Sequence, residues 1–241
     1  MLKIDCSSDN AGIDWNHKGN PLSEITEARK NTHRLPPQFE LIAGNVGLDF
    51  VNTLDDRHTQ PKELLRTYLD LARFGEDAGL LDSTQANQLY ERSYMEPDRA
   101  QEVLLWGREL RESIHDVFWA IMNKRPVPAL ALARLNADAQ GAAQHMSLVP
   151  SARGTKGAGS FVWKYDDLRA FDSVLWPIAR AAADLLTSDK LPYVRACLSK
   201  TCEWFFLDTS KSHHRRWCDM TRCGNRAKGQ RFYARKKKAS S

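Results

Sequence analysis

The chain has 241 residues, 42% of them hydrophobic, and a formal net charge of +5. This length gives one large domain or a medium domain with a small one, and the apolar content is enough to form a core. The charge is unevenly distributed. Residues 195–241 carry 13 Lys and Arg against 3 Asp and Glu, whereas residues 1–194 carry 22 against 27. A basic end on an acidic body predicts two parts with different partners.

The sequence shows neither a membrane segment nor an export signal. No apolar stretch reaches the ~18 residues that suggest a membrane span. Residues 1–12 lack the basic segment and the apolar run of a signal peptide. We therefore expect a cytoplasmic protein with no membrane partner. Thiols stay reduced in that compartment, and clustered cysteines there bind metal more often than they form disulfides.

The first part of the chain predicts a flexible leader followed by a helical domain. Residues 1–35 are polar and lack a sustained hydrophobic period, which is typical of a flexible segment. We expect the domain over residues 36–190. It starts with a short extended segment at 39–44 and a helical apolar face within 47–56.

Capping signals predict three helices in the next stretch. A polar side chain with a partner three residues later predicts a helix start, a glycine after the last turn predicts an end, and proline fits a first turn. The signals are Thr67 with Asp70 before a helix that ends at Gly79, Asp82 with Gln85 before a helix over 83–94, and Pro97 before a helix over 98–123.

Hydrophobic periodicity predicts the remaining elements of the body. They are a helix over 128–144, a hairpin of 145–151 and 160–165 around a flexible loop, and a helix over 168–187. Pro177 lies inside the last helix, so we expect a kink or a break there.

Catalytic signatures are missing from the sequence. No GxGxxG or GxxxxGK[ST] motif occurs, which argues against a dinucleotide or P-loop enzyme. No Ser–His–Asp or Cys–His arrangement stands out. The acidic pairs Asp55–Asp56 and Glu109–Glu112 lack partners that would separate an acid from a base. We therefore expect a protein that is not an enzyme.

Four cysteines near the C-terminus predict a structural metal site. Their spacing is Cys197-x4-Cys202-x15-Cys218-x4-Cys223. Each close pair offers two thiolates from one turn, and the segment between the pairs brings them together, which suits tetrahedral Zn²⁺. Four protein ligands leave no open position for water, so we expect one structural, non-catalytic zinc per chain.

Two alternatives to this ligand set follow from the same stretch. An iron–sulfur cluster also uses thiolates, although it usually shows a tighter cysteine run and fewer flanking basic residues. His213 or His214 offers a nitrogen ligand in place of one thiolate, or both histidines are simply basic surface. We favour the four cysteines because they complete the set alone.

The residues around and after the last cysteine predict a nucleic-acid surface. The stretch 224–238 is typical of a basic helix, and a run of charge beside a metal-folded module favours polyanion binding over a merely solvated face. The candidate contacts share a cationic side chain that reaches phosphates or guanine edges. They are Arg215, Arg216, Arg222, Arg226, Lys228, Arg231 and Arg235.

Polar residues beside the first helical face are candidate contacts for a small ligand. Asp49 and Asn52 are three residues apart and share one side of a helix, and Thr53 and Arg57 follow. The alternative is that these groups cap the local backbone or face solvent.

Two stretches of the chain resemble known families. Residues 195–235 resemble the CGNR zinc finger through FLDTS (206–210), RRWC (215–218) and CGNRAK (223–228). The preceding part resembles the ABATE domain, which accompanies this finger in bacterial stress-induced transcription regulators. The segments that carry this second resemblance are GLDFVNTLDDR (47–57), DLARFGEDAGLL (70–81) and AADLLTS (182–188).

The resemblance implies an α+β fold in two parts. The first is a mostly helical N-terminal domain with a small β-hairpin, which binds a small ligand. The second, over residues 191–241, is a small treble-clef-like zinc finger with a basic C-terminal helix, which binds DNA. The resemblance also implies that the four cysteines hold zinc and that Arg215, Arg216, Arg226 and Lys228 contact nucleic acid.

The leading hypothesis is therefore a DNA-binding, nucleoid-associated transcription regulator. An unknown small-molecule effector would change how the body holds the finger, and hence its affinity for double-stranded DNA. The alternatives are an RNA-binding zinc-finger protein, an enzyme acting on a small molecule with a docking finger, and a protein-interaction finger. A single finger makes few base contacts, so a homodimer through the body would extend the DNA site.

Overall fold

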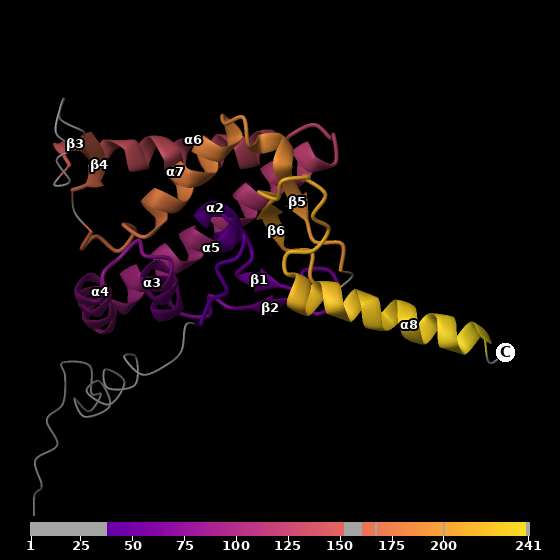
Figure 1. The fold of residues 1–241 in the computed structure, drawn as a ribbon. Coiled ribbons are helices and arrows are strands. Elements are labelled where there is room, and N and C mark those ends of the chain that lie inside the picture. Colours follow the sequence, from indigo (N-terminus) through magenta and orange to yellow (C-terminus); the bar gives the residue numbers. More distant parts are fainter. Residues whose placement is uncertain (1–37, 152–160, 167, 200, 240–241) are drawn as a thin grey trace, which may run out of the picture. The chain divides into compact units, whose positions relative to one another are not determined.

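The computed structural model describes residues 38–151, 161–166, 168–199 and 201–239 (Figure 1). The predicted leader over 1–35 and the predicted loop over 152–160 lie outside these residues. The described part is a mostly helical α+β fold, as the sequence predicts, and the predicted hairpin is present as one of three two-stranded antiparallel sheets. It contains no helix with the length and apolar character needed to cross a membrane.

The body of the described chain consists of six helices and two hairpins. In chain order they are α2 (Val46–Val51), β1 (Leu54–Asp55), β2 (Lys62–Glu63), α3 (Tyr68–Asp77), α4 (Ser83–Met95), α5 (Pro97–Met122), α6 (Ala129–Gln144), β3 (Met146–Pro150), β4 (Phe161–Tyr165) and α7 (Leu175–Leu186). The C-terminal part then adds η1 (Leu191–Tyr193), β5 (Val194–Ala196), β6 (Phe205–Leu207), η2 (Met220–Gly224) and α8 (Asn225–Ala239).

The capping residues start the helices where the sequence predicts. Thr67 caps α3 and Asp82 caps α4, and in both cases the third helical residue returns a side-chain bond to the backbone of the cap. Pro97 is the first residue of α5. Gly79 follows α3 with a φ of +68°, a left-handed conformation that glycine adopts without a steric penalty.

Two predictions about the body need correction. Helix α7 begins at Leu175 rather than at 168, so that Pro177 lies in its first turn, where a missing N–H loses no intrahelical bond. The segment 39–44, predicted to be extended, contains no strand. Trp163, in β4 of the predicted hairpin, is 57% exposed, because no second layer of the described chain covers that hairpin.

Helix α5 is the central element of the body. It packs against α2, α3, α4, α6 and α7, and its apolar stripe is buried at Leu110, Ile114, Val117 and Phe118. Figure 1 shows α2 beside α5 and α7. A β-carbon on Gly47 would lie 3.0 Å from the Ala182 β-carbon, so glycine is what lets α2 approach α7.

The C-terminal part shares the hydrophobic core of the body. Phe205 and Phe206 of β6 are 2% and 0% exposed and belong to the same cluster of buried residues as α2 and α5. Strand β6 packs directly against α2. The apolar residues around the cysteines are therefore part of the core of the body and not a separate cluster.

Candidate metal centre and nucleic-acid interface

The β5–β6 hairpin brings the first two cysteines together. Cys197 directly follows β5, and its N–H donates to the carbonyl of Trp204 at 2.8 Å, which extends the ladder of the hairpin. Cys202 N–H donates to the carbonyl of Ser199 at 3.1 Å and closes a turn between the two cysteines. Both thiols consequently face the same side of the loop that joins the strands.

The start of the terminal helix supplies the second pair. Cys218 precedes η2 and Cys223 lies within it. The Asp219 carboxylate caps this helical segment by accepting from Arg222 N–H at 2.7 Å. Leu198 N–H donates to the carbonyl of Arg216 at 3.0 Å, which ties the second cysteine segment to the first turn.

The four thiols have the geometry of a tetrahedral metal site. Their sulfur atoms all lie within 4.8 Å of one another. The Sγ–Sγ distances are 3.4 Å between Cys202 and Cys218 and 3.6 Å between Cys218 and Cys223. A Zn–S bond of about 2.3 Å gives a tetrahedron with edges of about 3.8 Å. These separations fit that edge, and they are far longer than the ~2.05 Å of a disulfide.

Hydrogen bonds among the thiols shift the pKa of three of them in different directions. Hydrogen bonds from Cys202 and Cys218 lower the pKa of Cys197 well below its ordinary value. Hydrogen bonds with Cys197 are the first cause that raises the pKa of Cys202 and of Cys218. Zn²⁺ binds cysteine sulfur as the thiolate, and its charge offsets the negative charge of the ligands. One structural zinc, held by these four cysteines, fits the site.

The two histidines that the sequence offers as alternative ligands are not part of the ligand set. Among the described residues, the group of side chains able to hold a metal consists of the four cysteines alone. The His213 ring stacks on Tyr193, with ring centres 3.9 Å apart, and its Nδ1 lies 3.0 Å from the Asp208 carbonyl. His214 is exposed. His213 therefore fixes the loop between β6 and Cys218.

Arg215, predicted to contact nucleic acid, directs its charge into the finger. Its guanidinium donates to the carbonyls of Trp217, at 2.9 Å, and of Cys218, and it lies over the Phe206 ring at 4.6 Å. Its backbone N–H donates to the buried carboxylate of Asp208 at 2.8 Å. These bonds hold the chain next to a zinc ligand, so the geometry of Arg215 is that of a positioning residue.

The other predicted contacts are more open to solvent. The side chains of Arg216, Arg222, Arg226 and Lys228 are exposed. Arg222 forms an ion pair with Glu40 of the body, and Arg226 donates to the Thr201 hydroxyl at 2.7 Å. Arg231 and Arg235 lie on α8, although their side chains fall outside what the structure describes.

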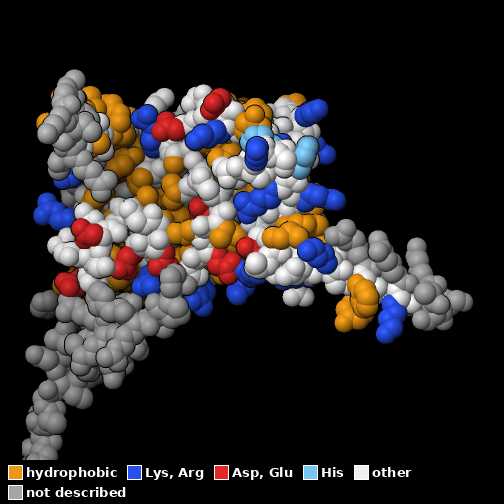
Figure 2. Space-filling view, viewed as in Figure 1, with side chains coloured by type: hydrophobic (Ala, Val, Ile, Leu, Met, Phe, Trp, Pro, Cys, Tyr) orange, Lys and Arg blue, Asp and Glu red, His pale blue; other side chains and the backbone are white. Residues whose placement is uncertain are grey.

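Helix α8 carries a dense positive charge. It has seven Lys or Arg and no Asp or Glu between residues 225 and 239. In Figure 1 it projects from the finger, and in Figure 2 blue Lys and Arg side chains gather over the finger on the face shown. Phe232 and Tyr233, in the middle of the helix, are 64% and 71% exposed. These two aromatic side chains are not among the contacts predicted from the sequence.

The four candidate ligand contacts of the body are engaged with the protein itself. Asp49 Oδ1 accepts from Ala43 N–H at 2.8 Å, and Thr53 donates to the carbonyl of Phe50 at 2.7 Å. Arg57 forms an ion pair with Glu112, and Asn52 binds the backbone of β6. This pattern matches the backbone-capping alternative more closely than a ligand pocket.

Burial also changes the ionisation of Asp49. It raises the pKa of that carboxyl to about 6, and hydrogen bonds from Ala43 and Ile42 oppose the shift.

Asn52 forms the main polar link between body and finger. Its side chain donates to the carbonyl of Phe205 at 2.9 Å and accepts from Phe205 N–H at 2.8 Å, so it pairs with β6 as a neighbouring strand would. Trp204 Nε1 donates to Asp55 at 2.8 Å beside it. Sequence reasoning missed this junction. The sequence feature that could have indicated it is the polar pair Asn52 and Thr53, which directly follows the apolar face of α2.

Comparison with protein families accounts for both parts of the chain. Residues 44–189 match the ABATE family, described as "Putative stress-induced transcription regulator". Residues 193–236, which include all four cysteines, match the CGNR zinc finger. A search of curated proteins found no match. Because the first match spans more than half of the sequence, the chain belongs to the ABATE family and carries a C-terminal CGNR zinc finger.

Proposed function

We propose that this protein is a DNA-binding transcription regulator whose zinc finger binds duplex DNA and whose body responds to a small effector. The family description supports a regulatory role. The observation that carries the DNA contact is α8, with seven cationic side chains, no acidic one and a first turn anchored at the metal site. In this proposal the protein has no enzymatic activity and acts in the cytoplasm at the nucleoid.

Zinc would act by fixing where α8 begins. Cys223 lies one turn before the exposed residues Arg226 and Lys228, and the Asp219 cap holds the same turn. A helix of this length is about 22 Å long, comparable to the width of a DNA duplex. A helix whose start is held by a metal site presents its charges to phosphates with less loss of conformational freedom than a free tail.

The effector would act through the junction of body and finger. Strand β6 is bound to Asn52 and packed against α2, so a change in the body alters the support of the finger. An effector changes DNA affinity only by the difference between its affinities for two arrangements of this junction.

The salt dependence of duplex binding tests the DNA contact. The zinc-loaded chain is titrated onto a fluorescently labelled duplex of mixed sequence at a series of salt concentrations, and binding is followed by anisotropy. If about five phosphates are neutralised, the logarithm of the binding constant falls against that of salt with a slope of about −4 to −5. A flat salt response would overturn the proposal.

A matched pair of lysine variants locates the contact. Lys228→Gln removes an exposed charge on α8, and Lys62→Gln removes an exposed charge on β2 in the body. We expect Lys228→Gln to reduce the steepness of the slope by about 1 and Lys62→Gln to leave it unchanged. Equal effects would mean that the finger is not the contact surface.

RNA binding is a second candidate because of the two exposed aromatic side chains on α8. Phe232 and Tyr233 are flanked by cationic residues, and exposed aromatic rings stack on unpaired bases. Competition between the duplex and a single-stranded RNA of equal length separates the candidates. Preference for the duplex supports DNA binding. Preference for RNA, weakened selectively by Phe232→Ser with Tyr233→Ser, supports the second candidate.

A further inference from the structure

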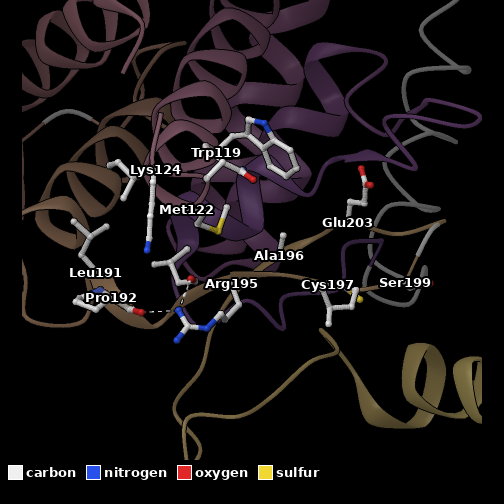
Figure 3. Close-up of a pocket in the computed structure, with 14 residues that line it drawn as sticks. Trp119, Met122, Lys124, Leu191, Pro192, Arg195, Ala196, Cys197, Ser199 and Glu203 are labelled. Atoms are coloured by element: carbon white, nitrogen blue, oxygen red, sulfur yellow. Dashed lines mark hydrogen bonds between the residues drawn. The ribbon is translucent and has the colours of Figure 1, made fainter. Parts of the chain in front are cut away.

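A cleft lies where the end of α5 meets the start of the finger. Its volume is about 710 Å³, and its walls come from α5 and the turn after it on one side and from η1, β5 and Cys197 on the other (Figure 3). This volume falls within the roughly 300–1,000 Å³ of ligand-binding clefts. The four ligand contacts predicted from the sequence do not line it.

Most of the lining is apolar. Trp119 and Met122 contribute from α5, and Leu191, Val194 and Ala196 contribute from the opposite wall. The Trp119 ring is only partly buried, and it is held in place by stacking on His115 and Phe205, at ring-centre distances of 6.0 and 6.3 Å. A fixed aromatic wall of this kind suits a flat apolar group.

Two cationic side chains lie on one side of the cleft. Figure 3 shows Lys124 and Arg195 directed toward the same region, close to Leu191 and Pro192. Arg195 uses Nη1 to bind the carbonyls of Pro192 and Val194, at 2.5 and 2.9 Å, which orients the guanidinium. Within the described ranges, neither Lys124 nor Arg195 forms an ion pair. Their charges are therefore available to an anionic group.

Glu203, which carries the carboxylate of the cleft lining, lies apart from Lys124 and Arg195 (Figure 3). Glu203 lies at the other side of the view in Figure 3. Its Oε2 is 2.7 Å from His58 Nε2, close enough for an ion pair although outside hydrogen-bond geometry. The charge of Glu203 is thus directed toward His58, while the other side of the cleft is positive.

We propose that this cleft binds a small amphipathic anion, with a flat apolar body against Trp119 and a carboxylate or phosphate at Lys124 and Arg195. This inference deepens the effector-sensing half of the proposed function and rests on it. A nucleic acid would use the two charges but not the apolar walls, so a small molecule fits the lining better. Because both body and finger form the walls, the bound molecule contacts both and stabilises one arrangement of the junction.

Three probes that share one ring system test the proposal. The zinc-loaded full-length chain is titrated calorimetrically, without DNA, with 2-naphthoate, 2-naphthyl phosphate and uncharged 2-naphthalenemethanol. We expect one site per chain, and an affinity for at least one anion that is about fivefold or more above that for the alcohol. The stronger of the two anions identifies the preferred head group. Equal affinities for all three, or binding of none, would overturn the proposal.

Two lysine variants show whether the probes bind in this cleft. We expect Lys124→Gln to lower the affinity for the tighter-binding anion about fivefold and to leave the affinity for the alcohol unchanged. Lys62→Gln removes an exposed lysine outside the cleft, and we expect it to leave both affinities unchanged. Equal effects of the two variants would overturn the assignment to this cleft. Since no DNA is present, failure of the DNA-binding proposal would leave these results untouched.

Discussion

Replacing Asn52 with alanine tests the junction that joins the body to the finger. The Asn52 side chain is 4% exposed and makes two hydrogen bonds to the backbone of Phe205. Alanine would leave a buried N–H and a buried carbonyl unpaired, at about 1–3 kcal/mol each. Because relaxation of β6 recovers part of this, we expect the free energy of unfolding to fall by about 2–4 kcal/mol.

Urea unfolding of the zinc-loaded protein measures this loss. Far-UV circular dichroism reports the helices, and tryptophan fluorescence reports the surroundings of the seven tryptophans, which include Trp204 beside the junction. Since body and finger share one core, both signals should shift to lower urea together. Asn136→Ala, at an exposed position of α6, is the control and should stay within about 0.5 kcal/mol of wild type. An equally small effect of Asn52→Ala would refute the account of the junction.

Other variants test the environment of single side chains. Burial raises the pKa of Asp49 from 3.8 to about 6, so the folded state holds this proton more tightly. The stability of wild type relative to Asp49→Asn is therefore highest below about pH 4, falls by roughly 3 kcal/mol at most as the pH rises through about 6, and is level above that. A carbon NMR titration of Asp49 with a midpoint below about 4.5 would contradict this. Arg215→Gln should speed zinc release to a chelator about tenfold and leave the DNA salt slope unchanged, whereas Arg216→Gln should reduce the slope and leave zinc release unchanged. The opposite pattern would show that Arg215 faces the nucleic acid.

Features set by neighbouring residues could be predicted from the sequence. The caps at Thr67 and Asp82 depend on groups three residues apart, so the chain itself brings the partners together. The paired spacing of Cys197, Cys202, Cys218 and Cys223 is similarly local within each pair. For the same reason, the basic helix after Cys223 begins where it was expected.

Features set by distant contacts could not be predicted in this way. Asn52 and Phe205 are separated by 153 positions, and nothing in either segment indicates the other. Arg215 has the composition of a phosphate contact, but the carbonyls of Trp217 and Cys218 engage its charge once the loop folds. The alternation around Trp163 predicts a strand, and it cannot indicate whether another layer covers that strand.

The zinc content of the purified protein tests the central claim most directly. Mass spectrometry under native conditions gives the number of metal ions per folded chain. The four-cysteine geometry predicts one zinc per chain for wild type, and loss of that zinc for Cys218→Ser. A folded wild-type chain without metal, or a Cys218→Ser chain that keeps its zinc as tightly as wild type, would contradict the account.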